Sequence, residues 1–216
     1  MGRLTHVALR KEIIAACLDM NATGLNQGTS GNVSARVRGG MLITPSGVPY
    51  DTLSPEDIVA VKPDGDFAGA LRPSSEWRMH ADIYRARSDA GAVVHVHSIA
   101  ATALACLRRP IPAFHYMVAV AGGDDIRCAD YALFGTQALS DAMASALEGR
   151  TACLLANHGQ IAFGPTVAKA LSLAREVETL AAMLLAAERS GKPKILSQAE
   201  MHEVLSAFKD YGAQRK

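Results

Sequence analysis

The chain alternates short apolar runs with longer helical patterns, and some of the short runs come in adjacent pairs joined only by a turn. The paired runs are residues 32–37 with 41–44, around Gly39-Gly40, and residues 58–63 with 67–71, around Asp64-Gly65. Strands joined by a tight turn run antiparallel, whereas parallel neighbours need a long crossover, usually a helix. This order of elements excludes a regular strand–helix repeat and predicts an α/β layered domain with a largely antiparallel sheet.

The helices are predicted from amphipathic spacing and from the signals at their ends. Residues 7–22 carry an apolar face and end near Gly24. The longest predicted helix covers residues 167–190 and is stopped by Gly191. A capping box, Ser197-Gln198-Ala199-Glu200, opens the last one. The other expected helices are residues 77–87, 98–107 and 137–147, and the other expected strands are residues 92–97, 114–121, 152–158 and 160–163.

Length and charge narrow the possible function classes. With 216 residues, 49% of them hydrophobic, the chain can bury a sizeable core, and we expect one domain over residues 1–216 with a flexible tail over about 207–216. The net charge of +1 provides neither the basic footprint of a nucleic-acid binder nor a polybasic membrane patch. The four cysteines form neither a CxxC pair nor a compact disulfide framework, so a reducing cytoplasm is the expected location.

One uncharged stretch, residues 90–107, could suggest a membrane span. It contains two histidines and two hydroxyl side chains, however. A buried strand followed by a helix explains this stretch better, and no membrane partner is expected.

Three of the histidines in or at the ends of predicted strands make a candidate site. In His95-Val96-His97, alternate strand residues face the same side of the sheet, so two imidazoles can converge on one ion. His158 precedes Gly159 at the end of another strand. The pattern fits two interpretations: partly buried structural histidines, or a catalytic metal site that keeps an open coordination position.

Three loops of small residues could hold an anion. They are Gly28-Thr29-Ser30-Gly31-Asn32, Thr44-Pro45-Ser46-Gly47 and Ser74-Ser75-Glu76. Their hydroxyls and unhindered backbone N–H groups, with a helix start after the third loop, can bind a phosphate without Lys or Arg. The alternative is that all three are ordinary turns and that Glu76 is a glutamate favoured at a helix start.

Other chemistries lack their signatures in this sequence. It contains no Walker A motif, no GxGxxG and no GxSxG elbow. No cysteine has a partnered histidine by motif, and none of the lysines stands out as a buried Schiff-base former.

Taken together, the chain resembles the class II (zinc-dependent) aldolases of the L-fuculose-phosphate aldolase type, in the adducin-like aldolase/epimerase superfamily. The resembling segments are LNQGTSGNVS, MLITPSGVPY, PSSEWRMH, AVVHVH, IPAFHYMVAVAGG, CADYALFGT, NHGQIAFG and FKDYG. They follow the family order from near residue 10 to Tyr211. The resemblance implies a three-layer α/β/α domain with a mostly antiparallel central sheet, assembled as a homotetramer with sites at subunit interfaces.

The resemblance also implies roles for individual residues. His95, His97 and His158 would bind one divalent ion per subunit, zinc in the first place, with cobalt, manganese or iron as substitutes. Glu76 would be the acid/base, and Tyr116 of a neighbouring subunit would protonate the aldehyde oxygen. The residues implied in binding the phosphorylated substrate and closing the site are Gly31, Asn32, Ser46, Gly47, Ser74, Ser75 and Tyr211.

The implied reaction is the reversible cleavage of a ketose 1-phosphate into dihydroxyacetone phosphate and a short aldehyde. L-Fuculose 1-phosphate, which releases L-lactaldehyde, is the first expected substrate. The alternatives are 5-deoxyribulose 1-phosphate and 5-methylthioribulose 1-phosphate, which arise in the salvage of adenosylmethionine by-products.

Other members of the same superfamily offer further alternatives. These are sugar-phosphate epimerases, dehydratases and decarboxylases, and the adducin-like modules that serve as scaffolds. Phe114-His115-Tyr116-Met117 has the aldolase form, whereas epimerases carry an acidic residue after the histidine. The joint presence of the three histidines and Glu76 argues against a scaffolding module.

Overall fold

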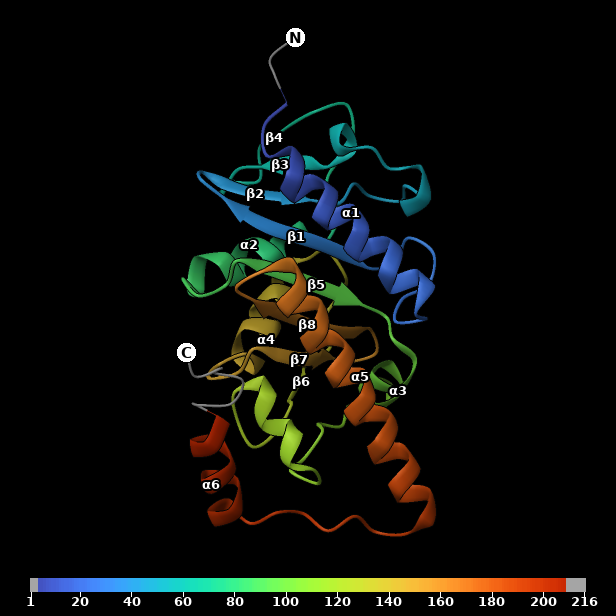
Figure 1. Cartoon of the computed structure of the whole chain (residues 1–216), viewed down its shortest axis with the longest axis vertical. Helices are drawn as coiled ribbons and strands as arrows, with labels where there is room; N and C mark the ends of the chain where they lie inside the picture. The colour runs from blue at the N-terminus through green and yellow to red at the C-terminus, as the bar shows by residue number, and fades with distance from the viewer. Residues whose placement is uncertain (1–3, 209–216) are drawn as a thin grey trace, which may run out of the picture.

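The computed structural model describes residues 4–208 (Figure 1). The helices are α1 (Val7–Ala22), α2 (Trp77–Ala86), α3 (Ile99–Cys106), α4 (Gln137–Ala146), α5 (Val167–Ser190) and α6 (Gln198–Phe208). The strands are β1 (Asn32–Val37), β2 (Gly40–Ile43), β3 (Val59–Val61), β4 (Phe67–Ala68), β5 (Ala92–Val96), β6 (Cys128–Ala129), β7 (Ala152–Leu155) and β8 (Gly159–Gly164). The 3₁₀ helices are η1 (Tyr50–Thr52), η2 (Pro55–Asp57) and η3 (Tyr116–Ala121).

The strands form one sheet in the order β4-β3-β2-β1-β5-β8-β7-β6. Every neighbouring pair is antiparallel except β6 and β7. The two predicted hairpins are present as β1–β2 and β3–β4. The prediction of a mostly antiparallel central sheet is therefore confirmed.

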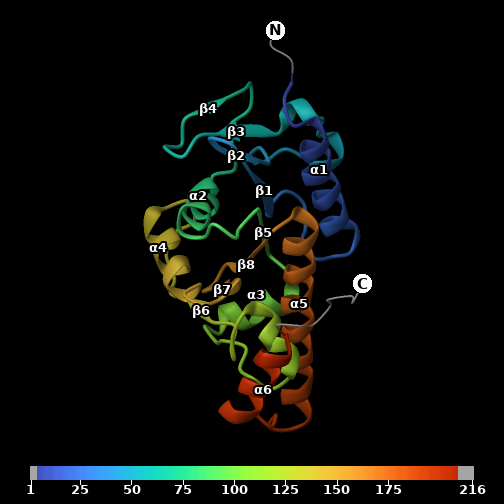
Figure 2. The same ribbon diagram turned by 60° about the vertical axis from the view of Figure 1, so that its left-hand side comes forward.

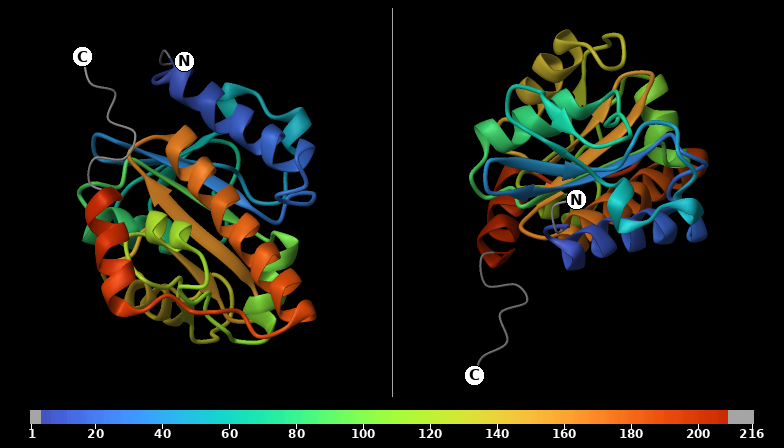
Figure 3. Two further views of the ribbon diagram at one scale, coloured as in Figure 1. Left: turned by 60° about the horizontal axis from the view of Figure 1, so that its bottom comes forward. Right: turned by 90° about the horizontal axis from the view of Figure 1, so that it is seen from above.

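Helices cover both faces of this sheet, which gives three layers (Figure 2). One core packs α1, α3 and α5 against the first face, and Figure 3 shows α1 and α5 lying across that face. A second core packs α2 and α4 against the other face. Because both faces are covered, the inner strands β5, β7 and β8 are buried at every residue and are mostly apolar, with His95 and Gln160 as the polar exceptions. The predicted three-layer α/β/α arrangement is confirmed.

The two-residue period of β5 decides which side of the sheet carries the histidines. Val94 and Val96 belong to the core under α1, α3 and α5, whereas Val93 belongs to the core under α2 and α4. His95 is two residues from Val93, so its side chain lies on the α2 and α4 side. The site is built on that face of the sheet.

Most helix boundaries agree with the sequence prediction because the capping signals are read correctly. α1 and α5 have the predicted ranges, α2 and α4 end one residue earlier than predicted, and α3 is one residue shorter at each end. Thr136 Oγ1 accepts the N–H of Leu139 at the start of α4. Ser197 and Glu200 form the expected reciprocal hydrogen bonds before α6.

The strand predicted over residues 114–121 is wrong. Tyr116–Ala121 form the 3₁₀ helix η3, which His115 caps by accepting the N–H of Met117 with its ring. A short apolar run has no period that separates a strand from a buried helical turn, so the sequence pattern alone could not distinguish the two. The sequence pattern also missed the two-residue strand β6 at the sheet edge.

Within residues 4–208, no helix combines the length and the apolar character that crossing a bilayer requires. The uncharged stretch at residues 90–107 is β5 followed by α3, as expected. Of the tail predicted over 207–216, residues 207 and 208 are the end of α6, and the remaining positions lie outside the described residues.

Candidate metal centre

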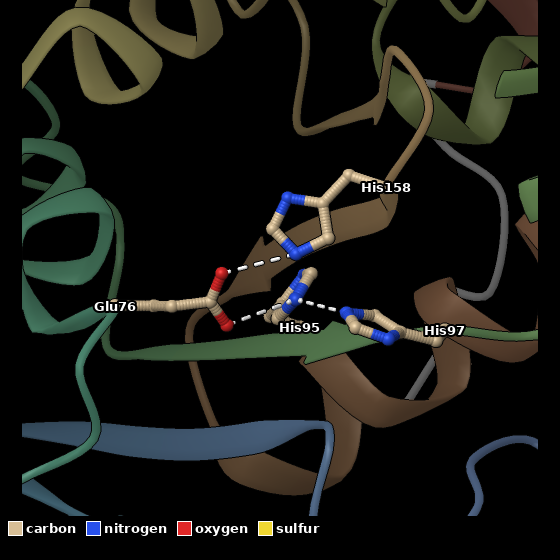
Figure 4. A group of neighbouring side chains, drawn as sticks. All are labelled: Glu76, His95, His97 and His158. Atoms are coloured by element: carbon tan, nitrogen blue, oxygen red, sulfur yellow. Dashed lines mark hydrogen bonds and ion pairs between the residues drawn. The ribbon is translucent and has the colours of Figure 1, made fainter. Parts of the chain in front are cut away.

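Three histidines and one glutamate converge beyond the carboxyl end of β5 (Figure 4). His95 lies within β5, and His97 follows its last residue. His158 lies in the turn between β7 and β8, and Glu76 is the N-cap residue of α2. The convergence of the two-histidine strand with His158, which the sequence pattern left open, is present in the structure.

The donor atoms are spaced as ligands around one ion. Nε2 of His95 lies 3.1 Å from Nε2 of His97 and 3.2 Å from Oε2 of Glu76. Nε2 of His158 lies 3.0 Å from Oε1 of Glu76. Ligands bound tetrahedrally at about 2.0–2.2 Å stand about 3.3–3.6 Å apart, close to these separations. Oε1 of Glu76 is also buried without a well-aligned hydrogen-bond donor, so these residues fit a divalent cation.

A backbone contact fixes the ring of His95. Its Nδ1 lies 2.8 Å from the carbonyl oxygen of Gln160 on β8. A carbonyl only accepts, so Nδ1 carries the hydrogen and Nε2 of the neutral ring presents its lone pair to the cluster. The Gln160 side chain donates to Ser98 Oγ at 2.8 Å and to the Ala174 carbonyl at 3.0 Å, which ties this part of β8 to α5.

The electrostatics of the cluster favour an ionised carboxylate. Burial opposes the charge on Glu76, but the charge of His95 and the contacts with His158 outweigh burial and hold the pKa of Glu76 well below its usual range. Burial, reinforced by His95 and His158, lowers the pKa of His97 to about 4. Burial also opposes a charge on His95, yet the Glu76 carboxylate raises its pKa. A divalent cation can take the place of the proton on His95 Nε2, and an anionic oxygen beside imidazole nitrogens is the donor set that such an ion requires.

A cavity of about 400 Å³ opens onto this cluster. Its described wall residues include no Lys or Arg. The wall residues are Thr29, Ser30, Ser46, Gly47, Ser75, Glu76, His97, Tyr131, Ala132, Leu133, Phe134, Asn157 and His158. The lining is therefore rich in hydroxyls at residues 29, 30, 46 and 75, and apolar and aromatic at residues 131–134.

The loops predicted to hold phosphate meet at the cavity, but their residues occupy different depths. Ser46, Gly47 and Ser75 line the wall and are exposed. Gly31, Asn32 and Ser74 are buried behind it. Ser74 Oγ accepts the N–H of Glu76 at 3.3 Å, so it supports the start of α2.

Two glycines permit the close packing that brings the loops to β5. A Cβ on Gly31 would lie 2.7 Å from the carbonyl oxygen of His95 and 2.8 Å from Oδ1 of Asn26. A Cβ on Gly159 would lie 2.9 Å from Cδ2 of His97. Both positions therefore require glycine because a larger residue would push against a metal-site strand or ring.

A left-handed residue turns the chain before His158. Asn157 has φ 55°, a conformation that asparagine tolerates better than most residues. This turn ends β7 at Leu155, before the residue 158 that the sequence pattern predicts, and it carries His158 back over the sheet. The Asn157 side chain accepts a hydrogen bond from Arg108 Nε at 3.0 Å.

The sequence pattern did not single out His80, yet the structure connects it to the site. His80 is fully buried on α2, and its Nε2 lies 2.5 Å from Oδ1 of Asn32, whose Nδ2 donates to Glu76 at 2.9 Å. The four-residue spacing of Glu76, His80 and Tyr84 places them on one helix face and could have indicated this connection.

Of the two predicted tyrosines, Tyr116 is the one within the described residues. Tyr116 stacks on His115, with ring centroids 4.8 Å apart, and is 48% exposed. It does not line the cavity, so its role stays a prediction that depends on a neighbouring subunit. Tyr211 lies outside the described residues.

Residues 11–185 match the family described as the Class II Aldolase and Adducin N-terminal domain. The chain is 52% identical over 208 residues to the 5-methylthioribulose-1-phosphate/5-deoxyribulose-1-phosphate aldolase of Rhodospirillum rubrum, covering 96% of this chain and 94% of that protein. It is 50% identical over 205 residues to the L-fuculose phosphate aldolase of Escherichia coli K12, covering 94% and 95% of the two chains.

The fold comparison agrees with the sequence comparison. A solved L-fuculose 1-phosphate aldolase superposes with a TM-score of 0.92 at 41% identity, over 95% of this chain and 98% of that one. Family, relatives and fold all coincide with the resemblance seen in the sequence, and the chain therefore belongs to the class II aldolase and adducin family, within which it is a class II aldolase.

Proposed function

We propose that this aldolase reversibly cleaves a ketose 1-phosphate into dihydroxyacetone phosphate and a short aldehyde. The observation that carries the proposal is the cluster of His95, His97, His158 and Glu76 opening into a cavity with a hydroxyl-rich wall. Neutral hydroxyl and backbone N–H groups suit a phosphate. The three histidines and Glu76 lie nearby, where the reacting carbons of the bound substrate would be positioned.

Two substrate types have support from the relatives. Similar proteins carry the names L-fuculose phosphate aldolase and 5-methylthioribulose-1-phosphate/5-deoxyribulose-1-phosphate aldolase, at comparable identity. These substrates share the phosphorylated half and differ in the aldehyde released. A methyl or methylthio group in place of a hydroxylated one changes discrimination by only about 1–3 kcal/mol in an apolar pocket, so the family alone does not choose between them.

The ion we propose is zinc, held by the three histidines with Glu76 beside them. Imidazole ligands suit zinc, and cobalt, manganese or iron could replace it. When bound, a divalent cation stabilises negative charge on substrate oxygens.

Glu76 is proposed as the proton carrier at carbon. In the synthetic direction its carboxylate takes a proton from the hydroxymethyl carbon of dihydroxyacetone phosphate, and the electron pair forms the new bond to the aldehyde carbon. Tyr116 of a neighbouring subunit then gives a proton to the aldehyde oxygen. Cleavage reverses these steps, so that the proton returns to carbon from Glu76.

The phosphate is proposed to bind at the exposed loop residues. Ser46, Gly47 and Ser75 offer hydroxyl and backbone donors at the cavity wall. Gly31, Asn32 and Ser74 complete the implied set from the layer behind. This arrangement holds the non-reacting end of the substrate and thereby orients the reacting carbons.

We propose that the chain forms one domain and assembles as a homotetramer in the cytoplasm. A tetramer would bring Tyr116, exposed on this chain, to the cavity of a neighbour, with Tyr211 closing it. All four cysteines are free, which suits a reducing compartment.

The substrate is tested by a coupled assay of dihydroxyacetone phosphate release. kcat/KM is compared for L-fuculose 1-phosphate, 5-deoxyribulose 1-phosphate and 5-methylthioribulose 1-phosphate, and the largest value identifies the substrate. Epimerised, dehydrated or decarboxylated product without any release would overturn the proposed reaction.

The role of Glu76 is tested by Glu76→Gln, which keeps the size but removes the base. Turnover should fall by about 10²-fold or more because proton transfer at carbon is lost. Metal content, measured by elemental analysis, should stay near one ion per chain, since the histidines remain. Wild-type turnover in this variant would move the proton-transfer role to another residue.

A further inference from the structure

A series of hydrogen bonds leads from Glu76 into the interior between β1 and α2. Asn32 Nδ2 donates to Glu76 Oε2 at 2.9 Å, and Asn32 Oδ1 lies 2.5 Å from His80 Nε2. His80 Nδ1 lies 2.7 Å from Ser34 Oγ, which lies 2.7 Å from the Tyr84 hydroxyl. All five side chains are buried, so these groups depend on one another rather than on water.

Two structural periods bring the five side chains into register. On β1, Asn32 and Ser34 face α2 because the residues between and after them pack into the core on the opposite face. On α2, Glu76, His80 and Tyr84 are four residues apart and share one face. Two residues along a strand advance about 6.6 Å and four along a helix about 6 Å, so the two rows stay opposite each other.

The donors in this series all point toward the carboxylate. Because the ionised Glu76 only accepts, the Asn32 amide must turn its nitrogen to Glu76 and its oxygen to His80. His80 Nε2 must then carry a hydrogen. Burial, with the nearby charge of His95, lowers the pKa of His80 to about 3 against the opposing effect of Glu76, so the ring is neutral and its Nδ1 accepts. The Ser34 hydroxyl donates to Nδ1 and accepts from Tyr84.

We propose that His80 is a positioning residue of this aldolase: through Asn32 it holds Glu76 by Oε2 and leaves Oε1 as the oxygen that exchanges the proton with substrate. This role rests on the proposed function of Glu76. Oε2 receives the Asn32 amide, whereas Oε1 has no well-aligned donor and faces Nε2 of His158 at 3.0 Å, within the cluster. Without a donor at position 80, the Asn32 oxygen has no partner and the amide can reverse, which sets its oxygen against the carboxylate.

The ring tautomer tests the direction of the series without any measurement of activity. Among the rings of the holoenzyme labelled with ¹⁵N-histidine, a neutral ring protonated at Nε2 only should lose its signals in His80→Gln. If the signals that disappear in His80→Gln belong to a ring protonated at Nδ1, or at both nitrogens at neutral pH, the proposal is overturned.

Matched substitutions test the consequence for turnover. The amide nitrogen of His80→Gln can reach toward Asn32 in place of Nε2, whereas the shorter side chain of His80→Asn cannot. We expect kcat of His80→Asn to fall by about tenfold, the scale of one lost hydrogen bond to a charged system, with KM changed by less than about threefold. His80→Gln should recover kcat to within about threefold of wild type, although both variants lose thermal stability.

His6→Asn is the control for this substitution, because His6 is exposed and lies outside the cavity. Its kcat should stay within about twofold of wild type. Equal kcat in wild type and His80→Asn, or equal losses in His80→Asn and His80→Gln, would refute the positioning role. Failure of the proposed function gives a different result. In that case Glu76→Gln keeps its turnover, or the wild type releases no dihydroxyacetone phosphate. The tautomer measurement then still decides the direction of the hydrogen-bond series.

Discussion

Gly31→Ala probes the close approach that joins the anion-binding loop to the metal-site strand. An added Cβ would lie 2.7 Å from the carbonyl oxygen of His95, and an ordinary contact is at least 3.4 Å, so the two segments must separate by about 0.7 Å. The same Cβ would press on Asn26 Oδ1, which accepts the N–H of His97 at 3.3 Å. Overpacking of this kind costs about 1–3 kcal/mol.

The expected results follow from these distances. A loss of about 2 kcal/mol should lower the Tm by about 4–8 °C for a chain of this length. Because His95 and His97 both contact the displaced segment, kcat/KM should fall by about tenfold or more. Differential scanning calorimetry and the dihydroxyacetone phosphate assay measure the two effects on the same sample.

Gly149→Ala is the matched control. Gly149 has φ +67°, and no atom lies within 4 Å of the position that an added Cβ would take, so its substitution costs backbone strain of about 1–2 kcal/mol without a clash. It should lower the Tm while leaving kcat/KM close to wild type. If Gly31→Ala keeps wild-type Tm and activity, or if it loses no more activity than Gly149→Ala, the argument from the close approach is wrong.

Three further predictions concern the metal, the assembly and the thiols. His95→Ala should lose bound zinc, measured by elemental analysis, but keep most of its secondary structure, measured by circular dichroism. The reason is that one ligand is removed from a cluster at the edge of an intact core. Full zinc content would contradict the ligand assignment. Mixed tetramers of Tyr116→Phe and Glu76→Gln chains should regain part of the activity that each lacks, and an active wild-type monomer in light scattering would exclude shared sites. Burial raises the pKa of Cys17 to about 12 and raises the pKa of Cys153 as well. Iodoacetamide at pH 8 should therefore leave both thiols unmodified in the folded protein and label them only after unfolding. Peptide mass spectrometry measures the labelling.

Local signals were sufficient for most of the secondary structure. The helix ends at Thr136, Ser197 and Gly191 carry capping residues whose action depends on the neighbouring turn only. The two hairpins are set by turn residues a few positions away from the strands they join. By contrast, η3 and β6 were missed because a short buried run is defined by what packs around it.

The sequence determined the kinds of residue at the site and the face on which some of them lie. The spacing of His95 and His97 on a strand places both side chains on the same side of the sheet. The family resemblance indicated His158 and Glu76 as their partners. Only the tertiary structure brings the β7–β8 turn and the start of α2 to the same point. These segments are far apart along the chain, and the order of the strands and the packing of α2 against the sheet place them side by side. The link from His80 through Asn32 to Glu76 also depends on the tertiary structure. Each row of side chains is periodic in the sequence. The two rows face each other only because of the register between a helix and a strand, which no local signal encodes.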